Sequence, residues 1–379
     1  MYNLLVSAKF PVWNQTSVDY RCSPKPLDKR LQQDIFIKSS PVNFKSATSN
    51  SAPLKTLRGM IDPYSGITML SNDELNAAEK LLGKCPDAKS AVKVLSRYTK
   101  NMLPTEKKMF SIFKDYAQKN QNGTFVTCLK GLRPDAYKKL LLEEFDVLDS
   151  VDDLSRNMSP DLALAVRHKT TRCRDIILKD DPNNPFKRKT LISSLDEISV
   201  SASEKNLFEK LKERAGYLPT SGSSVNAFIV KYTDTAKPRS HQEIAKRLLR
   251  PSLQSAEHIH PDSLGGANSL GNFMLTTAGR NSERGNMPMP KFIEKYPDIP
   301  KYTQMHVEQI IDNIHNGKLK GHEDYPYKLK QSLNNESNGL INLDLSSYKY
   351  SEEEAENLVL LNKTKSDTKK EFNFDPFKI

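Results

Sequence analysis

The chain has 379 residues, of which 37% are hydrophobic and 27% charged, and its formal net charge is +11. This length allows one large or two modest domains, and no apolar run is long enough to cross a bilayer, so a membrane protein is not expected. The excess of Lys and Arg suits a polyanionic partner, because cations that neutralise phosphates release counterions. The alternative is a basic protein whose lysines only solvate its surface.

Four single cysteines, at Cys22, Cys85, Cys128 and Cys173, form no Cys-x-x-Cys pair. The sequence therefore predicts neither a zinc ribbon nor a disulfide framework, and scattered thiols fit a reducing compartment. The polar Lys9 interrupts the apolar start too early for a signal peptide. We expect a cytoplasmic location and buried cysteines without a chemical role.

Residues 1–55 are predicted to form an N-terminal arm or linker, partly without fixed structure. The reason is that residues 39–52 are rich in Ser, Asn, Pro and Thr. The Pro-Tyr-Ser-Gly turn within residues 60–70 indicates a short hairpin.

Residues 56–215 are expected to form a helical domain, because apolar side chains recur there at helical spacing. Ser71 and Glu74 form a capping box, and Ser201 with Glu204 has the same spacing. A basic cluster follows in this domain: Arg167, His168, Lys169, Arg172, Arg174, Lys187, Arg188 and Lys189. It indicates either a phosphate-facing surface or an ordinary solvated helix face.

Residues 216–333 are expected to form a second domain, with residues 334–379 as a C-terminal extension. Residues 225–232 are predicted to be a strand or a buried segment. The capping box that starts at Ser240 begins a helix, which places His241 on the surface of its first turn. Three further histidines are spaced too loosely for a metal site and are assigned to helix surfaces: His306, His315 and His322.

The segment 255–286 has the order strand, loop, strand, helix. Glu257 and His258 are adjacent and so point to opposite faces of a strand, but a turn at Pro261 lets both reach one site. Gly265 and Gly266 permit a loop conformation that other residues resist. The apolar run 273–275 suits a second strand, and a short helix closed by glycine follows. The expected fold is mainly α with a small ββα hairpin unit, α+β overall.

The polar groups of this segment have a consistent chemistry. Glu257 offers a carboxylate oxygen and Asn281 an amide oxygen, ligands that suit Mg²⁺ or Mn²⁺. The imidazole of His258 can accept a proton near neutral pH. Arg280 and Arg284 are candidates to clamp phosphate oxygens, since a guanidinium is a planar fork of donors.

The whole ordered set resembles the HNH endonuclease family of the His-Me finger (ββα-metal) type. The family pattern of acid-His-Ile-x-Pro, Gly-Gly, a middle Asn and a later Asn is matched here by residues 257–261, by residues 265–266, and by Asn272 and Asn281. The resemblance implies that His258 is the general base, that Glu257 and Asn281 hold one divalent metal, and that Asn272 ties the loop that aims His258.

Two departures from the family pattern stand out. Thr277 and Arg280 occupy positions where many relatives place a zinc-binding cysteine pair, so no structural zinc is expected. The metal-binding acid is Glu257 where Asp is more familiar, and its extra methylene shifts the carboxylate. His260 either contacts phosphate, supports His258, or only shapes the loop.

The resemblance implies a metal-dependent nuclease acting on nucleic acid, with double-stranded DNA favoured by family habit. Its biological settings would be bacterial defence, toxins, phage DNA processing or mobile elements. Two other readings stay open: a nucleic-acid-binding protein with a catalytically silent module, and an interaction protein in which the motif is accidental. No P-loop is present, so no NTPase is expected.

Overall fold

The structure is a computed structural model that describes residues 51–179, 188–234 and 238–348. This part of the chain is mainly helical and contains one antiparallel sheet of two strands, as expected. None of its helices combines the length and the apolar character needed to cross a membrane. The N-terminal arm, except for its last residues, and the end of the C-terminal extension lie outside the described residues.

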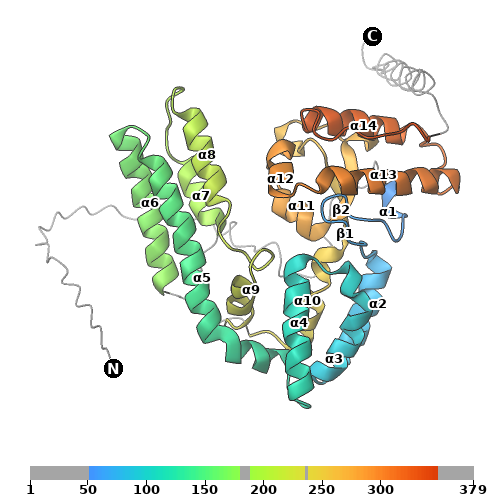
Figure 1. The fold of residues 1–379 in the computed structure, drawn as a ribbon, viewed down its shortest axis with the longest axis horizontal. Helices are drawn as coiled ribbons and strands as arrows, with labels where there is room; N and C mark the ends of the chain where they lie inside the picture. The colour runs from blue at the N-terminus through green and yellow to red at the C-terminus, as the bar shows by residue number, and fades with distance from the viewer. Residues whose placement is uncertain (1–50, 180–187, 235–237, 349–379) are drawn as a thin grey trace, which may run out of the picture. The chain divides into compact units, whose positions relative to one another are not determined.

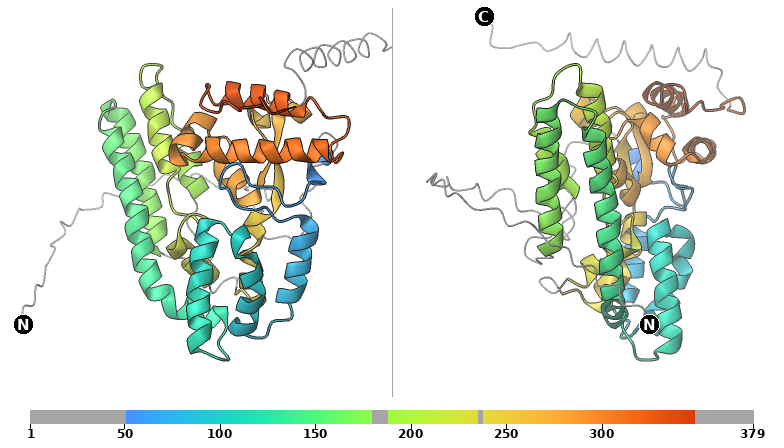
Figure 2. Two further views of the ribbon diagram at one scale, coloured as in Figure 1. Left: turned by 45° about the vertical axis from the view of Figure 1, so that its right-hand side comes forward. Right: turned by 60° about the vertical axis from the view of Figure 1, so that its left-hand side comes forward.

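The α-helices before the sheet are α1 (Ala52–Lys55), α2 (Asn72–Leu82), α3 (Ala88–Leu95), α4 (Pro104–Lys119), α5 (Phe125–Ser155), α6 (Pro160–Lys179), α7 (Arg188–Asp196), α8 (Lys205–Ala215), α9 (Val225–Tyr232) and α10 (His241–Arg247). The strands are β1 (Gln254–His258) and β2 (Phe273–Thr277). The helices after the sheet are α11 (Ala278–Arg284), α12 (Met289–Lys295), α13 (Ile299–His315) and α14 (Tyr325–Glu336). Figures 1 and 2 show their arrangement.

One hydrophobic cluster joins α2, α3, α4, the first half of α5, α9 and α10. The capping boxes predicted at Ser71 and Ser240 are both present. Residues 225–232 form a helix rather than a strand, and Ala227, Phe228 and Ile229 in it are buried. Ser224 caps this helix by accepting a hydrogen bond from the Ala227 amide.

His241 was expected on the surface and is buried instead. Its Nδ1 accepts a hydrogen bond from the Phe125 amide at 3.0 Å, and its Nε2 lies 2.9 Å from the Asp87 carbonyl oxygen. The imidazole therefore joins the starts of α3 and α5. Burial lowers its pKa, which favours the neutral ring that can accept the amide proton.

A second cluster joins the rest of α5 with α6, α7 and α8. The helix predicted to start with a cap at Ser201 begins only at Lys205. The hydroxyl of Ser201 donates to the Glu204 carboxylate instead, and the Glu204 amide donates to the Ser201 carbonyl oxygen, so these residues form a turn before the helix.

The third cluster surrounds the two strands with α12, α13, α14 and the chain up to Tyr348. It also contains apolar side chains from the start of the described chain: Leu54, Leu57, Met60, Tyr64 and Met69. The buried Asp62 carboxylate accepts hydrogen bonds from the Thr276 hydroxyl at 2.6 Å and the Thr277 amide at 2.9 Å. The segment 51–70 thus supports the sheet.

Two backbone hydrogen bonds lie where the chain leaves the third cluster after segment 51–70 and returns to it at β1. The Leu70 amide donates to the Ser252 carbonyl oxygen, and the Gln254 amide donates to the Leu70 carbonyl oxygen, both at 2.8 Å. The cores therefore differ from the expected domains 56–215 and 216–333. Residues up to 70 pack with the sheet, whereas α9 and α10 pack with α2–α5.

Candidate active site on the hairpin

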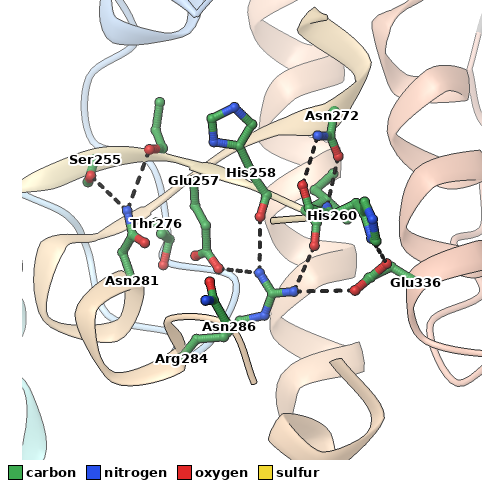
Figure 3. Close-up of polar contacts among 12 residues, drawn as sticks. Ser255, Glu257, His258, His260, Asn272, Thr276, Asn281, Arg284, Asn286 and Glu336 are labelled. Carbon is green, nitrogen blue, oxygen red and sulfur yellow. Dashed lines mark hydrogen bonds and ion pairs between the residues drawn. The ribbon is translucent and has the colours of Figure 1, made fainter. Parts of the chain in front are cut away.

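The two strands pair with His258 opposite Phe273 and Glu257 opposite Met274. α11 begins directly after β2, where the Thr277 hydroxyl accepts a hydrogen bond from the Arg280 amide at 3.3 Å. The helix ends at Gly285, whose φ of 51° favours glycine. Antiparallel strands followed at once by a short helix bring the motif residues into one small unit (Figure 3).

Asn272 fixes the loop that connects the strands. Its buried amide oxygen accepts a hydrogen bond from the His260 amide at 2.8 Å. Its amide nitrogen donates to the carbonyl oxygens of His260 at 3.0 Å and Ala267 at 2.9 Å. A Cβ on Gly266 would lie 1.9 Å from the His260 carbonyl oxygen, so the loop requires glycine there. One side chain thereby holds both ends of the loop that follows His258.

His258 is the last residue of β1 and is half-buried. Its ring lies against Phe273, with centroids 4.3 Å apart, and its Nε2 is 2.8 Å from the amide oxygen of Asn268. An Nε2–H donated to that oxygen leaves the Nδ1 lone pair as the basic site. Asn268 was not among the predicted site residues, although its place two residues after Gly-Gly was a usable signal.

Glu257 points to the opposite face of β1, toward α11, as strand alternation requires (Figure 3). Its Oε1 lies 2.5 Å from Nη1 of Arg284, while its Oε2 is buried and has no hydrogen-bond partner among the described residues. Burial raises the pKa of Glu257 to about 7, and the charge of Arg284 and the neighbouring Tyr64 hydroxyl oppose that rise. The turn at Pro261 comes too late to bring Glu257 and His258 to the same face.

Arg284 was expected to clamp phosphate, and the structure corrects this expectation. Its guanidinium is buried and donates to the carbonyl oxygens of His258 at 3.1 Å and Ile259 at 2.7 Å, besides the Glu257 carboxylate. Burial is possible because the carboxylate compensates the charge and, with the two carbonyl oxygens, accepts from both Nη atoms, whereas Nε has no hydrogen-bond partner among the described residues. Arg284 therefore stabilises the end of β1 from within the core of the protein.

Asn281 lies in the second turn of α11 and faces β1. Its amide nitrogen donates to the Ser255 hydroxyl at 3.1 Å, and this contact turns the side chain toward the strand. Its amide oxygen has no hydrogen bond to the described residues. In Figure 3, Asn281 and Glu257 lie on the α11 side of β1, whereas the His258 ring points away from it.

Arg280 was also expected to contact phosphate but is buried. Its guanidinium pairs with Glu283 at 2.5 Å and lies 4.1 Å from the centroid of the Tyr296 ring. The Arg280 guanidinium, which was predicted to contact phosphate, thus interacts with a carboxylate and an aromatic ring of the protein itself.

His260 is exposed and is bonded within the protein at both ring nitrogens. Nδ1 lies 2.8 Å from the Glu336 carboxylate at the end of α14, and Nε2 lies 3.2 Å from the Leu264 carbonyl oxygen. Both neighbours are acceptors, and Glu336 raises the pKa of His260, which favours the doubly protonated ring. The contacts agree with the loop-shaping alternative rather than with phosphate contact.

The other predicted site residues lie elsewhere. Arg172 is exposed on α6, and Lys187 and the side chain of Arg188 lie outside the described residues. His306 was assigned to a helix surface but is fully buried in α13, where its Nδ1 donates to the Ile61 carbonyl oxygen at 2.6 Å.

The donor set next to α11 fits a hard divalent cation in part. Glu257 Oε2 is a buried oxygen without a hydrogen bond, and the amide oxygen of Asn281 is uncommitted on the same side of β1. Such oxygens are ligands for Mg²⁺ or Mn²⁺ when water and phosphate complete the shell. The guanidinium of Arg284 on the other Glu257 oxygen opposes a second cation there.

Comparisons of the chain with protein-family models, with curated proteins and with solved structures found no match.

Proposed function

We propose that this chain is a metal-dependent endonuclease of the HNH type that hydrolyses phosphodiester bonds of nucleic acid, with the hairpin as its active unit. The observation that carries the proposal is the set of hydrogen bonds made by Asn272, which closes the loop directly behind His258. A loop fixed in this way presents one imidazole in a defined direction. Geometry of this kind is what positioned acid–base chemistry needs.

The placement of His258 and Glu257 on opposite faces of β1 is compatible with in-line attack. In such a displacement the attacking and the leaving oxygen lie on opposite sides of phosphorus. A phosphodiester at the end of β1 can receive water from the His258 side, and its leaving oxygen would approach the other face of β1 from the side of Asn281, because Glu257 is buried. His258 Nδ1 then takes the proton from water, with Asn268 holding the ring through Nε2.

Glu257 and Asn281 are the residues that would hold the divalent ion. When bound, such an ion stabilises the charge that develops on the phosphoryl and leaving oxygens. Arg284 fixes the direction of the Glu257 carboxylate and leaves Oε2 for the ion.

Cleavage of supercoiled plasmid DNA tests the proposal. Wild type should nick the plasmid with Mg²⁺ or Mn²⁺ and not with chelator, and His258→Ala should lose on the order of 100-fold or more of the rate. His315→Ala is the matched control, because His315 is exposed at the end of α13. A structured RNA in parallel decides between substrates. Equal rates for wild type and His258→Ala on both nucleic acids would refute the proposal.

The second candidate is a nucleic-acid-binding protein whose hairpin no longer cuts. The specific observation in its favour is the buried Arg284–Glu257 pair, which already places a cation on the carboxylate that would hold the metal. Calorimetry with Mn²⁺ separates the two. The nuclease predicts binding that Asn281→Ala weakens at least tenfold, whereas the silent module predicts no site-specific binding.

A further inference from the structure

The exposed surface of α2, α3 and α4 carries an excess of basic side chains. These residues are exposed and belong to no ion pair within the described residues: Lys80, Lys84, Lys89, Lys93, Arg97, Lys100, Lys107, Lys108, Lys114 and Lys119. We call this set the lysine surface. The three helices stand side by side in Figures 1 and 2.

The acidic residues of the same segment are mostly engaged elsewhere. Asp73 pairs with Arg58, Glu79 pairs with Arg250, and Glu106 is buried against Arg247. Glu74 and Asp87 cap the starts of α2 and α3. Asp115 is the remaining exposed acid of these helices, so the positive charge of the lysine surface is largely uncompensated.

The basic side chains follow the helix faces that point away from the core. Lys89, Lys93 and Arg97 recur every four residues along α3 and the 3-10 turn that follows it, opposite the buried Ala91 and Leu95. Residues four apart on a helix are neighbours, so these charges form a row. A row of cations suits a partner with regularly repeated anions.

The lysine surface adjoins the hairpin. Leu103, at the start of α4, lies so close to α11 that a Cβ on Gly279 would be 2.6 Å from its side chain. Burial raises the pKa of Glu106, in the first turn of α4, and the nearby charge of Arg280 on α11 opposes that rise. The N-terminal end of α4 therefore packs against the helix that carries Asn281, through buried side chains.

Two residues of the basic cluster on α6, for which a phosphate-facing surface and a solvated face were both open, are paired within the protein. Arg174 pairs with Asp149 and Asp152, and Lys169 pairs with Glu197. Arg167 and Arg172 of this cluster are exposed and have no ion pair within the described residues, so the structure leaves both alternatives open.

We propose that the lysine surface binds the phosphate backbone of a double-stranded nucleic acid and guides it to the hairpin. Single strands are bound with the help of exposed aromatic rings, and Tyr98 and Tyr116, the aromatic residues of this surface with some exposure, are half-buried. The guiding role rests on the proposed nuclease function, but the binding itself does not.

The test measures binding of a labelled DNA duplex of about 25 base pairs, enough to cross the surface at 3.4 Å per pair. It uses the full chain with His258→Ala, in chelator, so that cleavage does not interfere. The patch variant combines Lys89→Gln, Lys93→Gln, Lys107→Gln and Lys114→Gln. The control combines Lys138→Gln, Lys139→Gln, Lys205→Gln and Lys210→Gln, exposed lysines of α5 and α8. A third variant replaces the four patch lysines with Arg.

We expect the patch variant to bind at least tenfold more weakly at about 0.1 M salt, and its slope of log K against log salt to fall by about three to four. The control and the Arg variant should stay within about twofold of the parent protein. Wild-type affinity in the patch variant, equal loss in the control, or loss in the Arg variant would overturn the proposal. So would tighter binding of polyglutamate or of anionic phospholipid vesicles than of the duplex.

The outcomes also separate this inference from the nuclease proposal. Binding through the lysine surface without cleavage by wild type leaves the inference standing and removes the nuclease. Cleavage by wild type with unchanged binding in the patch variant does the reverse.

Discussion

The carboxylate of Glu257 and the guanidinium of Arg284 meet at 2.5 Å between β1 and α11, and both side chains are shielded from water. A buried pair of this kind depends on both members, since either one alone is an uncompensated charge. The same guanidinium also satisfies two carbonyl oxygens at the end of β1. The pair therefore links the strand that carries the proposed base to the helix that carries Asn281.

Arg284→Met should destabilise the protein by about 3–5 kcal/mol, because it leaves the Glu257 carboxylate buried and unpaired. Urea unfolding of the wild type and of Arg284→Met at neutral pH measures the effect. Glu257→Gln combined with Arg284→Met should recover part of the loss, since the double variant buries no charge. A loss below about 1 kcal/mol in Arg284→Met would contradict the pairing.

Asn272→Ala should cost about 2–4 kcal/mol of stability and most of the cleavage activity. It removes three hydrogen bonds and leaves the amide and carbonyl groups of a tight loop unpaired. Chemical denaturation and plasmid nicking provide the two readouts. Asn76→Ala provides a comparison, because it changes an exposed asparagine in the middle of α2, outside the hairpin. Full activity in Asn272→Ala would show that the loop does not need this tie.

Asn268→Ala should reduce the cleavage rate about tenfold while leaving stability unchanged within about 0.5 kcal/mol. Asn268 is exposed, and its replacement removes the acceptor at Nε2 of the His258 ring. The rate at saturating substrate should fall rather than the affinity. A variant with the wild-type rate would mean that Phe273 alone orients the ring.

His306 should make the protein sensitive to mild acid. Burial lowers its pKa from 6.5 to about 4, so the folded protein resists a proton that the unfolded chain accepts. Stability is then fully present above about pH 6.5 and is lost as the pH falls toward about 4, by up to about 3 kcal/mol. Unfolding curves between these pH values measure the slope.

His306→Gln is the informative variant for this prediction. Its amide nitrogen can still donate to the Ile61 carbonyl oxygen, but it does not titrate. The variant should therefore lose the part of the pH dependence that belongs to residue 306. An unchanged slope would assign the acid sensitivity to other groups.

Features set by neighbouring residues could be predicted from the sequence. The capping boxes at Ser71 and Ser240 and the strand–loop–strand–helix order of residues 254–284 depend on local spacing, and the structure has them. Residues 225–232 are a short apolar run, for which helix and strand give similar patterns. The cap at Ser224 and packing against α5 decide for the helix.

Contacts between distant parts of the chain could not be predicted in this way. His241 and His306 were predicted to lie on helix surfaces. In the structure their ring nitrogens form hydrogen bonds with the backbone of Phe125 and Ile61, which are distant in sequence. The functional interpretation of Arg284 failed for the same reason. Its charge suggested phosphate, whereas the buried carboxylate and the carbonyl oxygens that receive it are visible only in three dimensions.

The support that Asp62 gives to the sheet has a consequence for synthesis of the chain. Its partner Thr276 follows 214 residues later, which at about 5–20 residues per second is roughly 10–40 seconds on the ribosome. During that time the apolar residues of segment 51–70 have no core to join, while the helices of α2–α10 already have theirs. The hydrophobic cluster that holds the hairpin is thus completed last, so a nascent chain carries the proposed base only after α2, α3 and α4, the helices proposed to bind nucleic acid, have been synthesised.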